Sequence, residues 1–138
     1  MRSLGVDLGE KRIGLALSDE DGIIASPLGT VMRTGDRAAV REIVRVVAER
    51  EVGEVVIGLP LRLEGTEGPA AVGARKFAER LGAEVAVPIR LWDERMTTAL
   101  AERAMIEGGA RRSERREKID RVAAAILLQS YLDSRPRP

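Results

Sequence analysis

The chain has 138 residues, a formal net charge of +1, 44% hydrophobic residues, one residue each of Phe, Trp and Tyr, and neither Cys nor His. The length fits a single domain over residues 1–138. The missing Cys and His exclude disulfides, thiol nucleophiles, imidazole bases and His- or Cys-ligated zinc. The scarcity of aromatic residues argues against a module that stacks bases on an aromatic platform.

The first third of the chain has the pattern of three strands. Residues 2–8 alternate between apolar residues and a face of small residues around Asp7, and residues 12–18 alternate in the same way. The short connector at 9–11 predicts a hairpin between them. Residues 23–31 predict a third strand, placed at a sheet edge because Pro27 cannot donate a ladder hydrogen bond.

The rest of the chain alternates between helices and strands. Asp36 has the position of an N-cap, residues 54–58 form a short apolar strand typical of a buried parallel one, and a helix over residues 70–81 is closed by Gly82. A fifth strand is expected at 84–91, a helix from Thr97 or Thr98 to about residue 106, a last helix from about 117 to 133, and a frayed tail at 133–138. This order predicts an α/β protein whose mixed sheet has helices on both faces.

Two features of the sequence bear on where in the cell the protein is found. The first strand follows Met1 almost at once, which leaves no room for a signal peptide, and no apolar run approaches the roughly 20 residues that cross a bilayer. We therefore expect a cytoplasmic protein with no membrane partner.

Asp120 is the acid whose direction can be argued most directly. Apolar residues follow it at helical spacing and extend one stripe along the last helix: Ala123, Ala124, Leu127, Leu128 and Tyr131. Asp120 continues that stripe, so we expect its carboxylate to face the sheet. The alternative is an acid that complements the helix dipole, worth roughly 0.3–1 kcal/mol. That alternative explains an acid in the first turn but not one on the buried face.

Three further acids lie at positions that suit a shared site. Asp7 is in the middle of a strand, where Asp is disfavoured, on a face cleared by Gly5 and Gly9. Asp93 and Glu94 follow the fifth strand, and ligands of open α/β sheets bind beyond the carboxyl ends of parallel strands. The alternatives are a turn acid at Asp7, and dipole complementation or pairing with Arg95 for the other two.

Together, Asp7, Asp93, Glu94 and Asp120 form a candidate catalytic set of hard oxygen ligands. Such ligands suit Mg²⁺ or Mn²⁺. Two such ions can hydrolyse a phosphodiester bond with no need of His, which predicts a metal-dependent nuclease and a nucleic-acid partner. We take Asp7, Glu94 and Asp120 as the expected metal set, with the choice between Glu94 and Asp93 left open.

Basic residues border the predicted site. A solvated loop is the ordinary explanation for the basic segment 111–118, but this segment leads into the helix that carries Asp120, which favours contacts with the phosphate backbone. The polar loop 61–69 should border the same edge. The residues expected to bind nucleic acid are Lys11, Arg12, Arg62, Arg95, Arg111, Arg112, Arg115, Arg116 and Lys118.

Five segments resemble, in order and spacing, the motifs of the YqgF/RuvX family: "GVDLGEKRIGLALSD", "VVIGLPLRLEGTEG", "ARKFAERLG", "LWDERMTT" and "KIDRVAAAILLQSYL". The resemblance spans residues 4–132. It implies an RNase H-like fold, in which the first three of five strands are antiparallel and the last two run parallel to the first. It also implies 5′-end processing of pre-16S rRNA in ribosome biogenesis, or Holliday-junction resolution in DNA recombination and repair.

The resemblance also implies roles for individual residues. Asp7 would be the metal ligand of the first strand, Asp120 the ligand of the C-terminal helix, and Asp93 or Glu94 the middle ligand, with Arg95 organising it. One departure is Arg62, where relatives often have Asn, which leaves a substrate role of that position open.

Two other functions remain as alternatives. The first hairpin also resembles the phosphate loop of actin-like and sugar-kinase ATPases, but those proteins use two copies of the core fold and this chain supplies one. A non-catalytic RNA- or ribosome-binding protein is the other alternative, and it would gain nothing from acids that face a phosphate backbone. A junction resolvase should be a homodimer, whereas an rRNA-processing enzyme can work as a monomer.

Overall fold

The computed structural model describes residues 1–96 and 112–135, of which 112–119 are described as backbone. Its centre is a five-stranded sheet in the order β3-β2-β1-β4-β5. The strands are β1 (Arg2–Leu8), β2 (Arg12–Ser18), β3 (Ala25–Met32), β4 (Val52–Leu59) and β5 (Ile89–Asp93). β1, β2 and β3 pair antiparallel, whereas β4 pairs parallel with both β1 and β5. The predicted mixed sheet is confirmed, with β3 at an edge.

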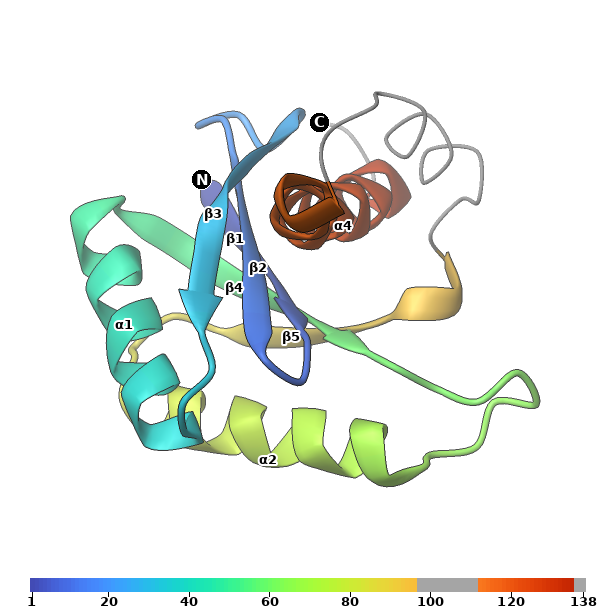
Figure 1. The fold of residues 1–138 in the computed structure, drawn as a ribbon. Helices are drawn as coiled ribbons and strands as arrows, with labels where there is room; N and C mark the ends of the chain where they lie inside the picture. Colours follow the sequence, from blue (N-terminus) through green and yellow to red (C-terminus); the bar gives the residue numbers. More distant parts are fainter. Residues whose placement is uncertain (97–111, 136–138) are drawn as a thin grey trace.

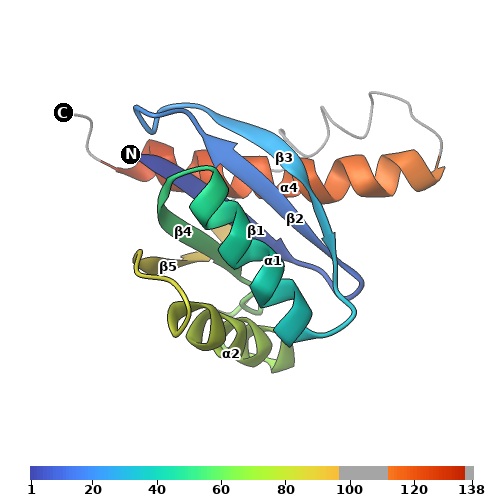
Figure 2. The same ribbon diagram turned by 90° about the vertical axis from the view of Figure 1, so that its left-hand side faces the viewer.

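Helices cover both faces of this sheet (Figure 1). α1 (Asp36–Glu49) and α2 (Pro69–Gly82) lie on one face, and α4 (Arg112–Ser134) crosses the other. The turned view shows the same two layers around the sheet (Figure 2). A short 3₁₀ turn, η1 (Glu94–Met96), follows β5 directly. Among the described residues, no helix combines the length and the apolar character that a bilayer-crossing segment needs.

The two faces of the sheet are packed differently. The face under α1 and α2 carries the larger core, with Leu4, Val6, Ile13, Ile57 and Phe77 among its fully buried residues. The face under α4 carries small residues, which let the helix come close.

Gly5 shows how close α4 approaches. A methyl group added at Gly5 would come within 2.8 Å of the Cβ of Leu128. At the far edge of the same face, the rings of Trp92 and Tyr131 meet edge to face at 5.5 Å. This tight contact fixes α4, and therefore Asp120, against β1 and β2.

Several element boundaries differ from those the sequence predicts. The N-cap of α1 is Gly35, not Asp36, because the Asp36 carboxylate pairs with Arg33 at 3.0 Å instead of capping the helix. Gly82 is the last residue of α2 rather than the residue that closes it. The predicted helix from Thr97 or Thr98 to about residue 106 lies outside the described residues.

Two further boundaries move for physical reasons. β5 begins at Ile89 rather than at residue 84, because the chain leaves α2 through turn hydrogen bonds to the carbonyl of Leu81. α4 begins at Arg112, so the segment that was predicted as a loop before residue 117 is helical backbone. The many charged residues of this segment hide the helical periodicity in its sequence.

Glu54 is the largest surprise in the core. The sequence predicts an apolar strand at this place, yet the Glu54 side chain is almost fully buried. It accepts hydrogen bonds from the Ser3 hydroxyl at 2.8 Å and the Tyr131 hydroxyl at 2.9 Å, and it also pairs with Arg135. This network ties the C-terminal end of α4 to β1 and β4, at the other end of the sheet from Asp7.

Candidate functional site

Asp7 lies on the α4 face of the sheet, between glycines on both neighbouring strands. It pairs with Gly14 of β2. On β4, Ile57 pairs with Val6, so the next residue, Gly58, lies on the other side of Asp7. A Cβ at Gly14 would come within 2.0 Å of the Asp120 carbonyl oxygen, and one at Gly58 within 2.5 Å of Glu94 Oε1. These two glycines make the room in which α4 and Glu94 approach Asp7.

Glu94 reaches over Gly58 to the Asp7 carboxyl group. The two carboxyl groups share a hydrogen bond. Burial, together with the charge of Asp7 and that of Asp93, raises the pKa of Glu94 to about 8. The pair therefore holds a proton at neutral pH, and a divalent cation at the same oxygens would relieve the same repulsion. A donor set of carboxylate oxygens fits Mg²⁺ or Mn²⁺.

Asp93 is engaged in a different way from Glu94. The Arg95 side chain donates to both of its carboxylate oxygens, with Nη2 at 2.7 Å from Oδ2 and Nε at 3.1 Å from Oδ1. These hydrogen bonds lower the pKa of Asp93. Of the two adjacent acids, Asp93 at the end of β5 orients Arg95, while Glu94 at the start of η1 faces Asp7. This arrangement favours Glu94 as a metal ligand.

Asp120 lies beside this pair, on the sheet-facing side of α4. Its carbonyl oxygen contacts Gly14, the cross-strand neighbour of Asp7. Its carboxylate forms a salt bridge with Arg12, at 3.3 Å from Nε to Oδ2. Within residues 1–96 and the described side chains from 120 onward, no three acidic side chains lie close enough together to hold a metal ion. The structure therefore brings the carboxyl groups of Asp7 and Glu94 together and pairs the Asp120 carboxylate with Arg12. A metal site shared by Asp7, Glu94 and Asp120 stays a prediction.

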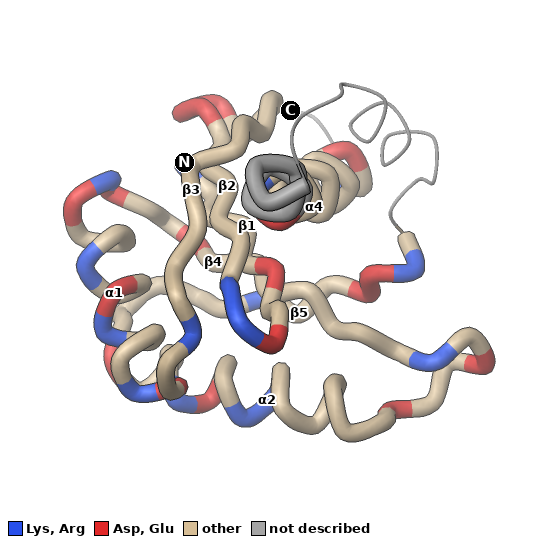
Figure 3. Tube along the Cα trace, in the orientation of Figure 1, with Lys and Arg blue, Asp and Glu red and all other residues tan. Residues whose placement is uncertain are grey.

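Basic segments border these acids at three places: the turn between β1 and β2, the loop after β4 and the end of η1 (Figure 3). They contain Lys11 and Arg12, Arg62, and Arg95, respectively. The first turn is braced by Arg33, which donates to the Gly9 carbonyl at 2.9 Å. The sequence did not identify Arg33, because its role depends on the end of β3 reaching that turn.

The basic residues ahead of Asp120 lie in or next to a segment of which only the backbone is described. Arg111 lies outside the described residues. Arg112, Arg115, Arg116 and Lys118 are in the first turns of α4, where only the backbone is described. Their contact with nucleic acid stays a prediction.

The raised pKa of Glu94 predicts how stability changes with pH when no metal is present. The folded protein keeps the Glu94 proton up to about pH 8, whereas the unfolded chain loses it near the ordinary value of 4.5. The folded state then binds more protons between these values, so the free energy of unfolding should fall as pH rises from about 4.5 to about 8. Denaturant titrations in EDTA across this range should show the fall, and Glu94→Gln should reduce it. An equal slope in the variant would contradict the assignment.

Comparison with known proteins gives consistent results. A family model described as "RuvX: Holliday junction resolvase" matches residues 1–134. A Myxococcus xanthus protein called "Putative pre-16S rRNA nuclease" is 46% identical over 138 residues, which cover all of this chain and 91% of the relative. A Chloroflexus aggregans protein of the same name is 44% identical, with 98% of this chain and 95% of the relative covered.

Solved structures resemble the fold at low sequence identity. Thermus thermophilus RuvC superposes with a TM-score of 0.54 at 17% identity, with 96% of each chain covered. The Fowlpox virus resolvase in complex with Holliday junction DNA gives a TM-score of 0.61 at 12% identity, covering 97% of this chain and 98% of the other. These likenesses show a shared RNase H-like fold. The family match over residues 1–134 and the relatives at 44–46% identity show that the chain belongs to the RuvX (YqgF) family.

Proposed function

We propose that this protein is a divalent-metal-dependent endonuclease that hydrolyses phosphodiester bonds in precursor 16S rRNA. The observation that carries the proposal is the Asp7–Glu94 carboxyl pair, whose shared hydrogen bond is made possible by Gly14 and Gly58 on either side of Asp7. Two acids in such contact repel each other unless a proton or a cation lies between them. A nuclease needs the cation.

Each acid has a distinct part in this proposal. Asp7 and Glu94 would hold the metal from β1 and from the turn after β5, and Asp120 would complete the set from α4. When bound, two Mg²⁺ or Mn²⁺ ions supply activation of the attacking water and stabilisation of the leaving oxygen. Asp93 acts through Arg95, whose position it sets by several hydrogen bonds.

The bordering cations would hold the nucleic-acid backbone. Arg95 is 39% exposed in spite of its bonds to Asp93, so it can also face a phosphate. Lys11 is exposed on the β1–β2 turn, and Arg62 lies in the loop after β4. Contacts of this kind position the strand without reading its sequence. The net charge of only +1 means that affinity rests on these local cations.

We favour precursor rRNA as the substrate because relatives that match almost the full chain, at 42–47% identity, are named "Putative pre-16S rRNA nuclease". We accordingly place the activity in the cytoplasm. Holliday junctions are the second candidate substrate, since the family model is described as a Holliday junction resolvase and a similar solved structure, that of Thermus thermophilus RuvC, contains a Holliday junction substrate. Resolution would require a homodimer that cuts two strands symmetrically.

Cleavage of both substrates by wild type, Asp7→Asn and Asp120→Asn with Mg²⁺ or Mn²⁺ tests the proposal. We expect wild type to cut precursor rRNA, and each variant to lose more than about a hundredfold in rate, because even outer partners of metal ligands are worth 10–100-fold. Asp21→Asn, at an exposed acid on the β2–β3 turn, is the matched control.

Each outcome of this assay has a definite meaning. Preferential cutting of four-way DNA would replace the rRNA assignment with the second candidate. Undiminished cleavage by both site variants would remove the acid site from the mechanism. Binding of RNA without any metal-dependent cleavage would leave the non-catalytic function.

A further inference from the structure

The turn that carries Glu94 lies beyond the end of the sheet. The ladder between β4 and β5 ends with the pair Leu59 and Asp93. Glu94 and Arg95 follow in η1, a single 3₁₀ turn of three residues. The hydrogen-bond geometry of such a short turn is poor, so contacts with other elements must fix its place. The position of the Glu94 side chain over Gly58 therefore depends on what holds η1.

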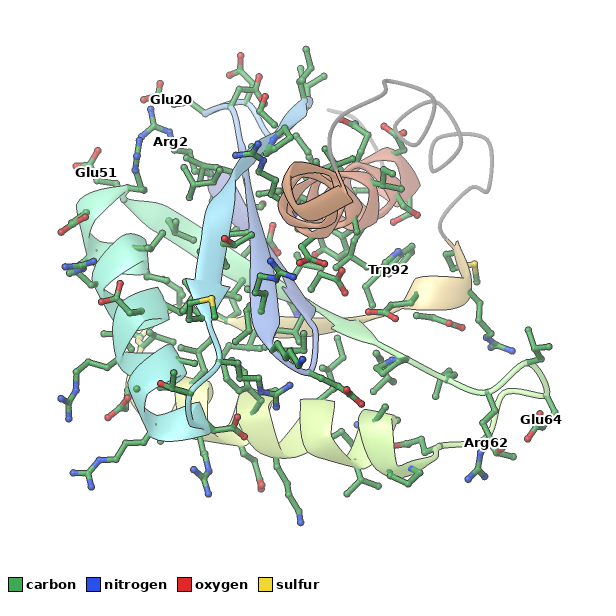
Figure 4. The ribbon with its side chains drawn as sticks, viewed as in Figure 1. Arg2, Glu20, Glu51, Arg62, Glu64 and Trp92 are labelled. Atoms are coloured by element: carbon green, nitrogen blue, oxygen red, sulfur yellow. The ribbon has the colours of Figure 1, made fainter. Side chains whose placement is uncertain are left out.

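The hydroxyl group of Ser130, on α4, makes such a contact. It accepts a hydrogen bond from the Trp92 indole Nε1 at 3.2 Å and donates one to the Met96 carbonyl oxygen at 3.1 Å. Trp92 lies where β5 passes α4 (Figure 4). A serine within a helix often donates to a carbonyl four residues earlier in the same helix, whereas this one donates to η1. One hydroxyl group thus binds the residues on both sides of the segment 93–95.

The neighbours of Ser130 hold this part of α4 in a fixed orientation. Gln129 Oε1 accepts a hydrogen bond from the Ala25 amide at 2.9 Å, at the start of β3. The Tyr131 hydroxyl donates to the buried Glu54 carboxylate of β4 at 2.9 Å. Successive residues of a helix point about 100° apart, so contacts from consecutive residues to different strands fix the rotation of α4 about its axis. Ser130 therefore faces η1 in a defined direction.

We propose that Ser130 is a positioning residue: by fixing η1, it holds the Glu94 carboxyl group beside that of Asp7. The inference rests on the proposed nuclease function, in which Glu94 is a metal ligand. α4 then sets two of the three acids relative to Asp7, since Asp120 belongs to the helix itself and Glu94 is held through Ser130. A group that orients a metal ligand is worth about 10–100-fold in metal affinity.

Trp92 is the single tryptophan of the chain, so its fluorescence reports the contact without metal or substrate. In EDTA, Ser130→Ala should shift the Trp92 emission to longer wavelength, because water replaces the hydroxyl as the partner of the indole N–H. With Mn²⁺ alone at pH 8, isothermal titration calorimetry should show about tenfold weaker binding by this variant. Ser130→Thr keeps the hydroxyl and should restore both the emission and the affinity.

Ser134→Ala is the matched control, because the Ser134 hydroxyl donates to the Tyr131 carbonyl within the same helix. It should have the wild-type emission and Mn²⁺ affinity, and thermal melts should show both alanine variants folded. If Ser130→Ala melted much lower than wild type, the threonine variant would decide, and a folded Ser130→Thr with the same loss of affinity would contradict the proposal.

Wild-type Mn²⁺ affinity in Ser130→Ala would overturn the positioning role of Ser130, whether or not the emission shifts. A wild type that binds no Mn²⁺ would instead overturn the proposed nuclease. The emission of Ser130→Ala in EDTA would still decide whether Ser130 fixes η1, with an unchanged spectrum counting against it. The two failures are therefore distinguishable.

Discussion

Replacing Glu94 by Gln should lower the rate of metal-dependent cleavage by more than about a hundredfold, whereas Asp93→Asn should lower it by only about tenfold. The difference follows from the two neighbours. Glu94 shares a hydrogen bond with Asp7 and would hold the cation directly, while Asp93 is occupied by Arg95 and acts by positioning it. A lost direct ligand should cost more than a lost outer partner. Single-turnover cleavage at saturating Mn²⁺ measures both.

Protein stability separates a metal role of Glu94 from a structural one. Without metal at pH 8, Glu94→Gln should melt at the same temperature as wild type or higher, because the variant removes the repulsion with Asp7. Added Mn²⁺ should raise the melting temperature of wild type but not that of the variant. If Asp93→Asn were the more damaging substitution, the roles of the two acids would have to be exchanged.

Gly14→Ala should destabilise the fold by about 3 kcal/mol or more and lower the melting temperature by roughly 10 °C. The added Cβ would lie 2.0 Å from the Asp120 carbonyl oxygen, which is helix backbone and cannot rotate away. Either α4 must lift from β1 and β2 or β2 must shift. Both changes move Asp120 relative to Asp7, so cleavage should fall as well. Denaturant unfolding monitored by circular dichroism gives the free energy.

Gly29→Ala is the control for this prediction. Gly29 lies on β3, and a Cβ there would meet nothing within 4 Å, so this substitution should change stability by less than about 1 kcal/mol. Gly58→Ala gives a useful contrast, because its Cβ would displace the end of a flexible side chain, Glu94, rather than backbone. We expect it to lose cleavage with little loss of stability. Wild-type stability of Gly14→Ala would mean that α4 does not lie this close to β2.

The sequence predicted the sheet and the direction of Asp120 because both depend on periodicity. The alternation around Asp7 and the helical stripe that ends at Asp120 are local patterns, and each names the face that a side chain takes. The proline in β3 placed that strand at an edge for an equally local reason. The structure has the mixed sheet with β3 at an edge, and it places Asp120 on the sheet-facing side of α4, as the patterns predict.

The rest of the candidate site depends on register, which no local pattern contains. That Gly14 and Gly58 flank Asp7 follows only from the pairing of β1 with β2 and β4. The sequence could not show that Glu94, rather than Asp93, faces Asp7, because this depends on the path of the chain at the end of β5. The pairing of Asp120 with Arg12, the brace from Arg33 and the burial of Glu54 each join residues from different elements. A charged residue inside an otherwise apolar strand was the available hint for Glu54.

Direct measurement of Mn²⁺ binding to wild type and Asp7→Asn at pH 8, by electron paramagnetic resonance or isothermal titration calorimetry, tests the central claim independently of any substrate. Wild type should bind Mn²⁺, because Asp7 and Glu94 then exchange a shared proton for the cation. Asp7→Asn should bind at least about a hundredfold more weakly. Equal affinity in the two proteins would contradict a metal site at Asp7 and Glu94.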